Sequence, residues 1–370
     1  MNEKNVPKIR FPKFTEPWEK RKVSELFKIT RGYVLATTET DEKSSNEKPY
    51  PVYSSQTKNN GLMGYYSDYL YENAITWTTD GANAGTVNYR PEKFYCTNVC
   101  GVLLSDEGYA NKMVAEALNL ISWKYVSKVG NPKLMNNVMS EIEIYLPNTL
   151  EEQEQIGNFF KKLDNLISLH QQKLEHLKKK KKGLLQKMFP KAGAKVPEIR
   201  FPEFTGDWEQ RKLGDVVDVR SGRDYKHLSE GSIPVYGTGG YMLSVNEALS
   251  YDEDAIGIGR KGTIDNPYIL KAPFWTVDTL FYAIPRGNFD LNFVFDIFQN
   301  IDWKKKDEST GVPSLSKTAI NEIAILTPKY DEQKKIGKYF KQLDNLITLH
   351  QRKLEHLQKQ KKALLQQMFI

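Results

Sequence analysis

The sequence has few of the features that mark secreted, membrane or metal-binding proteins. Only 2 of its 370 residues are cysteine and 5 are histidine, which excludes a disulfide framework and argues against a structural zinc site. No apolar run approaches the ~20 residues of a membrane span, and residues 1–14 lack the apolar core of a signal peptide. We therefore expect a cytoplasmic chain in which Cys96 and Cys100 are half-buried thiols.

Motifs that would identify a catalytic chain are also missing. There is no G-x-x-x-x-G-K-[ST] phosphate loop, and DNPYIL at 265–270 fails the N-P-P-aromatic pattern of adenine methyltransferases. No His/Asp/Glu cluster suggests a metal nuclease, and no Ser–His–Asp arrangement can be placed. A stand-alone glycosidase or nuclease retains one weak feature, the acidic run at 252–254. We expect no catalytic residue and no metal site, and a protein-binding scaffold is the other alternative.

The strongest positive signal is an internal repeat. VPKIRFPKFTEPWEKRKVSEL at 6–26 returns as VPEIRFPEFTGDWEQRKLGDV at 196–216, and the segment 151–189 returns as 331–369. The stretches between these blocks are much less alike. The chain is therefore predicted to be two copies of one unit, each a variable lobe followed by a long helix.

The segment GIGRKG at 257–262 matches the G-x-G-x-x-G pattern of dinucleotide-binding turns. That fold requires a helix directly after the glycines and an acidic residue about 20 positions later. The residues that follow are rich in β-formers and are interrupted by Pro267 and Pro273, so no helix can start there. We expect a tight turn between strands that carries Arg260 and Lys261 at its tip.

The repeated segments 151–189 and 331–369 place apolar residues in a 4-3 pattern through several heptads, which is typical of a coiled coil. Two near-identical helices in one chain are most simply paired with each other, antiparallel. His170 and His350 fall at core positions and are expected to be structural. The apolar face is wider than one seam, so either a further helical partner or the lobes must cover it. Expected coiled-coil or subunit contacts are Ile156, Phe159, Phe160, Leu163, Leu166, Ile167, Ile336, Tyr339, Phe340, Leu343, Leu346 and Ile347.

The variable lobes, about 6–147 and 196–328, mix short β-like runs with one late helical piece, which is an α+β pattern. The net charge of +7 lies in the helical segments, so a general positive field does not explain what the lobes bind. Their Asn, Gln, Arg, Lys and Asp side chains suit the reading of base edges, although turn formation is the alternative for any one of them. Candidate DNA contacts are Ser54, Ser55, Gln56, Lys58, Asn59, Thr78, Thr79, Asp80, Asn83, Tyr236, Thr238, Arg260, Lys261, Thr263, Ser314, Ser316 and Lys317.

This organisation resembles the specificity subunit of type I restriction-modification systems, which serve bacterial defence. The resemblance covers nearly the whole chain. It rests on two variable lobes separated by repeated helices, on RFPEFTGDWEQRKLGDV at 200–216, on EEQEQIGNFFKKLDNLI at 151–167 and on GVPSLS at 311–316. The first lobe has GNPKLM at 130–135 in place of GVPSLS, which leaves the role of that loop open.

The resemblance implies that each lobe is a target recognition domain reading one half of a bipartite, asymmetric site in double-stranded DNA. The helices set the spacer and dock two modification subunits, which carry S-adenosylmethionine and methylate adenine. Restriction subunits that use ATP and Mg then join, so this chain itself needs no cofactor.

The expected fold is α+β, with two pseudo-symmetric α/β target recognition domains joined by two long antiparallel coiled-coil helices. The expected boundaries are 1–147 and 191–328 for the recognition domains and 148–190 and 329–370 for the helices.

Overall fold

The computed structural model of the protein describes residues 5–55, 59–191 and 193–370. It divides into two compact units, one comprising Met1–His170 with Lys353–Ile370 and the other Gln171–Arg352. Each unit therefore contains one variable lobe and a part of each long helix. No helix among the described residues is long and apolar enough to cross a membrane.

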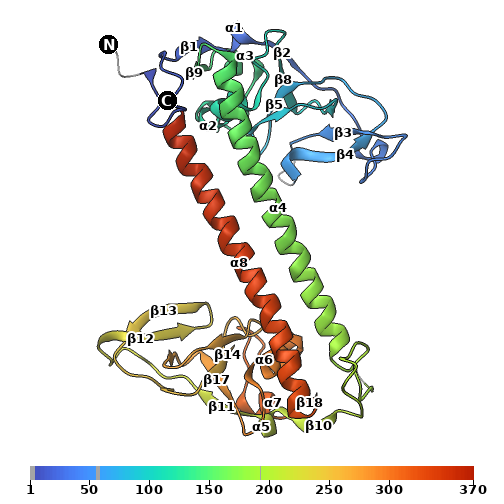
Figure 1. The fold of residues 1–370 in the computed structure, drawn as a ribbon, viewed down its shortest axis with the longest axis vertical. Coiled ribbons are helices and arrows are strands. Elements are labelled where there is room, and N and C mark those ends of the chain that lie inside the picture. The colour runs from blue at the N-terminus through green and yellow to red at the C-terminus, as the bar shows by residue number, and fades with distance from the viewer. Residues whose placement is uncertain (1–4, 56–58, 192) are drawn as a thin grey trace. The chain divides into compact units, whose positions relative to one another are not determined.

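The first unit is built from short strands and ends in a long helix (Figure 1). Its strands are β1 (Glu19–Lys22), β2 (Lys28–Arg31), β3 (Tyr50–Tyr53), β4 (Leu62–Tyr66), β5 (Ala74–Thr78), β6 (Val87–Arg90), β7 (Tyr95–Cys96), β8 (Cys100–Leu104) and β9 (Glu143–Leu146). Its helices and 3-10 turns are α1 (Val23–Leu26), η2 (Thr37–Glu39), η3 (Asn59–Gly61), α2 (Lys112–Ile121), η4 (Ser122–Tyr125), α3 (Asn136–Ser140) and α4 (Leu150–Met188), the last of which continues into the second unit. The strands form a ribbon β1-β9 and two sheets, β2-β8-β5-β6 and β4-β3-β7.

The second unit repeats this order element by element. Its strands are β10 (Glu209–Lys212), β11 (Val217–Ser221), β12 (Glu230–Gly237), β13 (Gly240–Val245), β14 (Ala255–Gly259), β15 (Tyr268–Leu270), β16 (Trp275–Thr276), β17 (Leu280–Pro285) and β18 (Ala324–Thr327). Its helices and 3-10 turns are α5 (Leu213–Val216), α6 (Leu291–Asn300), η5 (Trp303–Lys306), α7 (Lys317–Asn321) and α8 (Tyr330–Met368). Strand orders β10-β18, β11-β17-β14-β15 and β13-β12-β16 match those of the first unit, so the repeat extends through the stretches where the sequences differ.

The repeated sequence blocks of each lobe contact each other, which gives a physical reason for their recurring together. Arg10 donates two hydrogen bonds to the carboxylate of Glu152, at 2.6 and 2.8 Å. Arg200 makes the same bidentate contact with Glu332, at 2.8 and 2.7 Å. Both glutamate side chains are 2% exposed. Each pair therefore fastens the first block of a repeat to the first turn of its long helix through a strong, charge-assisted contact.

The long helices are also part of the lobe cores. In the first unit, Phe160 of α4 and Met368 of α8 are buried in one cluster with Trp18 and Trp77. In the second unit the two helices exchange roles, so that the start of α8 and the end of α4 are buried against Trp208 and other core residues. At the terminal turns of both helices, the lobes therefore cover the apolar face, which is one of the two arrangements that the sequence predicted.

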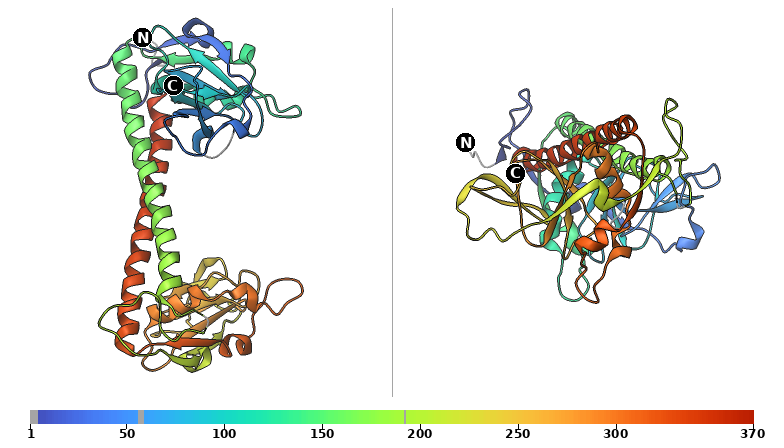
Figure 2. Two further views of the ribbon diagram at one scale, coloured as in Figure 1. Left: turned by 90° about the vertical axis from the view of Figure 1, so that its right-hand side faces the viewer. Right: turned by 90° about the horizontal axis from the view of Figure 1, so that it is seen from below.

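Within each unit α4 and α8 run antiparallel, and each is unbroken in the two views of Figure 2. In the first unit Phe160 packs on Phe369, whereas Asp164, one turn later in α4, accepts from Lys361 at 2.6 Å. Residue numbers therefore fall along α8 as they rise along α4. The second unit repeats the pattern in the pairs Phe189–Phe340 and Lys181–Asp344. The predicted antiparallel pairing of two long helices is confirmed.

The expectation of half-buried thiols is wrong, because Cys96 and Cys100 are 0% and 3% exposed. They lie where β7 and β8 enter an apolar cluster with Tyr53 and Phe94. Burial raises the pKa of Cys100 to about 11 and raises the pKa of Cys96 as well. Both thiols are therefore protonated and unreactive at neutral pH.

Candidate functional site

In the second lobe the GIGRKG segment forms a turn, and no helix follows it. The chain leaves β14 and returns as the antiparallel strand β15. The turn is hydrogen-bonded to the GVPSLS segment, since Leu315 N donates to Arg260 O at 2.9 Å and Gly262 N donates to Pro313 O at 2.8 Å. Gly262 has a φ of 95°, in the left-handed region that glycine tolerates. The prediction of a tight turn in place of a dinucleotide site is confirmed.

The first lobe makes the same arrangement from different residues. Leu134 N donates to Thr79 O at 2.8 Å, and Gly81 N donates to Pro132 O at 3.0 Å. GNPKLM thus occupies in the first lobe the place that GVPSLS occupies in the second, which answers the question that the sequence left open. We call these segments the paired loops; they comprise 79–81 with 132–134, and 260–262 with 313–315.

The paired loops present different charges in the two lobes. In the second lobe Arg260, Lys261 and the neighbouring Thr263 are exposed. In the first lobe Asp80 is half-buried and lies 3.5 Å from the ammonium of Lys133. One pair of loops is therefore cationic, and the other combines a carboxylate with a lysine.

Two of the candidate contacts in the first lobe are buried. Thr78 and Thr79 are only 8% and 6% exposed, and the Thr79 hydroxyl donates to the Asp80 carboxylate at 2.7 Å. Thr78 ends β5, a strand that is buried on both faces, and Thr79 follows it directly. Lys133, which sequence reasoning missed, is exposed at this position instead.

Three other candidates of the first lobe, Ser54, Ser55 and Asn83, take part in hydrogen bonds within the lobe. Ser54 shares a hydrogen bond with the Thr97 hydroxyl at 3.0 Å, and Asn83 donates to the Ser55 carbonyl at 3.0 Å. Asn59 is exposed. Gln56 and Lys58 lie outside the described residues.

The other candidates of the second lobe divide into structural and exposed groups. The Ser316 hydroxyl accepts from Ala319 N at 3.0 Å and thereby caps α7, and Ser314 N donates to the Asp307 carboxylate at 2.9 Å. Backbone donors from Ser314 and Ser309 lower the pKa of Asp307. Lys317 is exposed, whereas Tyr236 and Thr238 are half-buried in and beside the β12–β13 hairpin.

The acidic run at 252–254 is not assembled as a catalytic pair. Asp254 pairs with Lys271 and accepts from Ala272 N at 3.0 Å, while Glu253 accepts from Arg220 at 3.3 Å. Across residues 5–55, 59–191 and 193–370, no three His, Cys, Asp or Glu side chains form a group that could hold a metal ion. The carboxylates of this run serve surface ion pairs.

The positions expected to make helix or subunit contacts separate by burial. Phe159, Ile167, Tyr339 and Ile347 are half-buried, and the buried positions are Ile156, Phe160, Leu163, Ile336, Phe340 and Leu343. The two that remain exposed are Leu166 and Leu346, at 46% and 44%, joined by Leu169 and Leu349 at 44% and 57%. Each helix therefore carries an apolar patch that its own unit leaves uncovered.

Where the long helices cross the lobe helices, two buried charge clusters differ in composition. In the first unit Glu116 and Asp164 both contact the ammonium groups of Lys112 and Lys361, between 2.6 and 2.9 Å. The sequence alone did not reveal the partners of Lys361. Two acids and two lysines balance in this cluster.

The second unit has one lysine for two acids. Lys181 donates to Asp344 at 2.5 Å and to Gln299 at 2.6 Å. Asp296 is 1% exposed, and its Oδ2 atom has no hydrogen-bond partner among the described residues. Burial raises the pKa of Asp296 well above its usual range, opposed by Lys181 and reinforced by Asp344 and Asp290.

Asp296→Asn is expected to stabilise the second unit at neutral and alkaline pH. Because the folded-state pKa of Asp296 is raised, its favourable contribution is fully present below about pH 4 and is lost as the pH rises through that pKa. Asparagine keeps the neutral form at every pH, so the advantage of the variant in urea unfolding should grow with pH. A variant less stable than the wild type at alkaline pH would contradict this.

Glu116→Gln is the matched control, since Glu116 occupies the corresponding place in the first unit. Its carboxylate contacts Lys112 at 2.6 Å and Lys361 at 2.9 Å. The change should cost about 1.5–3 kcal/mol at neutral pH, the value of hydrogen bonds to a charged group. The two neutralising substitutions should therefore act in opposite directions.

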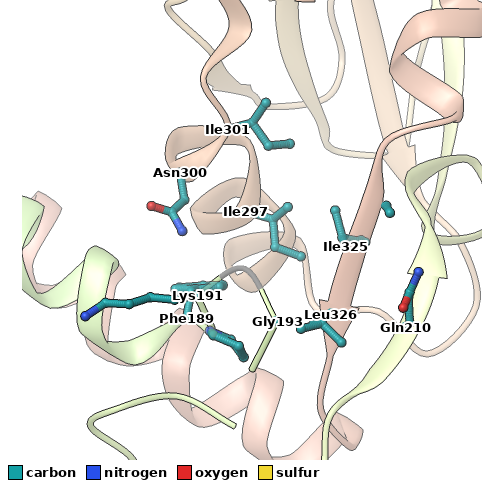
Figure 3. A pocket seen from close by; sticks show the side chains of 11 residues that line it. Phe189, Lys191, Gly193, Gln210, Ile297, Asn300, Ile301, Ile325 and Leu326 are labelled. Carbon is teal, nitrogen blue, oxygen red and sulfur yellow. The ribbon is translucent and has the colours of Figure 1, made fainter. Parts of the chain in front are cut away.

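A cavity of about 400 Å³ contains none of the candidate DNA contacts. It lies in the second unit between the end of α4, helix α6 and the ribbon β10-β18. Figure 3 shows Ile297 and Ile325 facing it, with Lys191 and Asn300 at its margin. Its lining mixes apolar side chains of the lobe core with Lys191, Gln210 and Asn300, and it includes no residue of the paired loops.

Comparison with known proteins shows to which family this arrangement belongs. The family profile described as the type I restriction modification DNA specificity domain matches the chain twice, over residues 15–179 and 205–359. The chain belongs to this family. It is a type I specificity subunit with two target recognition domains, a non-catalytic subunit for DNA recognition.

Relatives of this specificity subunit cover most of its length. A Mycoplasma pneumoniae protein named as a type I specificity subunit is 29% identical over 336 residues, 85% of this chain and 86% of that protein. The specificity subunit of the MjaVIII type I restriction enzyme of Methanocaldococcus jannaschii is 25% identical over 419 residues, 98% and 94% of the two chains. The crystal structure of an S subunit from M. genitalium shares the fold, with a TM-score of 0.79 at 20% identity over 99% of both chains.

Proposed function

We propose that the two lobes read the two halves of a bipartite, asymmetric sequence in double-stranded DNA. We also propose that α4 and α8 set the spacing between the half-sites and dock two methyltransferase subunits. One observation carries the proposal: the same two main-chain hydrogen bonds form the paired loops in each lobe, yet the side chains on them differ in charge. A common scaffold with exchanged side chains is what two different half-sites require.

The chemistry of the loops fits the edges of bases in the major groove. Arg260 and Lys261 suit the two acceptors of guanine, whereas Asp80 suits the amino group of cytosine and Asn59 suits adenine. A good bidentate contact discriminates its base by about 1–3 kcal/mol. The two lobes therefore favour different sequences.

The exposed leucines support the docking of two partners. Leu166 and Leu169 on α4 correspond to Leu346 and Leu349 on α8, and all four are at least 44% exposed. Apolar patches of this kind mark protein-binding surfaces. Since the two patches are equivalent, they suit two copies of one methyltransferase subunit. We assign S-adenosylmethionine to those subunits, and ATP and Mg to restriction subunits that join them.

Mapping methylated adenines in a genome that carries this chain and its modification subunit tests the proposal. We expect one bipartite, asymmetric motif. Replacing residues 6–147 with the lobe of another family member should change one half of that motif and leave the other intact. A simultaneous change in both halves would refute the independent reading of half-sites.

Arg260→Ala is expected to weaken binding to the mapped site by about 1–3 kcal/mol, with relaxed preference at one base pair, if the guanidinium contacts guanine. If it contacts only phosphate, affinity should fall equally on all sequences and the salt slope should fall by about one. Competition binding at several salt concentrations separates these results. Arg211→Ala is the control, because Arg211 is an exposed arginine of β10 outside the paired loops. Unchanged affinity of the Arg260 variant would restrict this residue to a role in the turn.

A further inference from the structure

The first lobe contains a small polar pocket of about 120 Å³ between its two sheets. Among the described residues that line it, none is acidic and one, Arg90, carries a positive charge. The uncharged hydroxyl and carboxamide side chains among these residues are Ser54, Asn60, Thr76, Thr78, Asn83, Thr86 and Asn88. The pocket thus offers one fixed positive charge and many hydrogen-bond donors, with no fixed negative charge in its wall.

Arg90 is 7% exposed and is held by neutral groups. It donates to Thr76 Oγ1 at 3.3 Å and to the Asn60 carbonyl at 2.6 Å, and its guanidinium lies 3.5 Å from the ring centroid of Tyr53. The nearby Glu92 carboxylate accepts instead from the Tyr53 hydroxyl at 2.5 Å. No ion pair joins Arg90 to a carboxylate within the described part of the chain, and a buried charge without one is costly.

The second lobe closes the corresponding space. Strand register places Tyr268 and Leu270 where the first lobe has Asn88 and Arg90. The Tyr268 hydroxyl donates to the Gly237 carbonyl at 2.6 Å, and a Cβ at Gly257 would come within 3.3 Å of the Tyr268 ring. The tyrosine ring therefore fills this position, so the pocket is a particular feature of the first lobe.

We propose that this pocket binds a phosphate oxyanion. Guanidinium, carboxamide and hydroxyl donors around a buried site match phosphate oxygens, and a bound anion would neutralise Arg90. Ser54 and Asn83 are also candidate DNA contacts, which places the pocket beside the proposed reading surface. The bound phosphate can come from the backbone of the target DNA or from free phosphate in solution. Only the first of these two sources rests on the proposed function.

The test titrates the full-length protein with inorganic phosphate, against chloride at matched ionic strength, by calorimetry. We expect saturable binding that Arg90→Leu weakens by about tenfold or more, as for the loss of charge-assisted hydrogen bonds. Asn88→Tyr, which introduces the residue of the second lobe and keeps Arg90, should also block binding. Lys93→Leu removes an exposed charge from the same lobe and should bind phosphate like the wild type.

A DNA arm identifies the source of the phosphate. If DNA supplies it, free phosphate should compete with the mapped duplex, and Arg90→Leu should lower the salt slope of DNA binding by about one. Phosphate binding with unaltered DNA binding identifies a free anion as the ligand. Absence of saturable phosphate binding to the wild type, or normal binding by a folded Asn88→Tyr variant, would overturn the proposal whether or not the lobes read DNA.

Discussion

Glu152→Ala should destabilise the first unit by about 3–5 kcal/mol, the cost of removing one partner from a buried ion pair. The substitution leaves Arg10, whose side chain is 9% exposed, with an uncompensated charge. It also removes the acceptor that lies 3.4 Å from the Trp18 indole nitrogen. Urea unfolding of the full chain, followed by tryptophan fluorescence, measures the loss.

The neighbouring Glu151 provides the control. It pairs with Lys13 at the surface, and its side chain is 71% exposed. Exposed ion pairs contribute little because water and salt screen them, so Glu151→Ala should unfold close to the wild type. Equal losses in the two variants would show that the buried pair has no special part in fastening the repeated blocks together.

Adding one heptad to each of α4 and α8, in register, is expected to change the preferred DNA spacer. Seven residues lengthen a helix by about 10 Å, which corresponds to roughly three base pairs at 3.4 Å each. The half-site sequences should stay the same because the paired loops are untouched. Affinity for the original site should fall, since three added pairs also rotate one half-site by about 100° relative to the other.

Selection of the preferred site from random DNA, with the modification subunit present, measures both spacer and half-sites. A heptad added to α4 alone is the control, because it moves Lys181 and Phe189 out of register with their partners on α8. That variant should lose the second unit's helix pairing. Altered half-site bases with the old spacer would contradict the proposed role of the helices.

Much of the fold could be predicted because the informative signals are local. Apolar spacing located the long helices, and the run AIGIG coincides with β14 (Ala255–Gly259). The strands β1 and β10 were not predicted, because EKRK and EQRK are too polar to resemble strands. They are paired by partners more than a hundred residues away, with surface ion pairs such as Lys22–Glu141 beside them.

The candidate site was only partly predictable because it also depends on contacts between residues that are far apart in the sequence. The turn carrying Arg260 followed from nearby prolines, but its pairing with Pro313 and Leu315 depends on long-range main-chain bonds. The burial of Thr78 was also not apparent from the sequence, since a strand covered on both faces shows no alternation of polar and apolar residues. Lys133 acquires its role only through contact with Asp80.

The main-chain bonding of the paired loops has a consequence for how such proteins diversify. Leu134 and Leu315 anchor the loops from inside, and neither bond that joins each pair involves an exposed side chain. Surface substitutions away from buried features usually change stability by less than about 0.5 kcal/mol. A lineage can therefore exchange residues at 80, 133, 260 or 261 while every intermediate remains folded. If these residues read the target as proposed, a new target sequence can then be acquired by point mutation without loss of the fold.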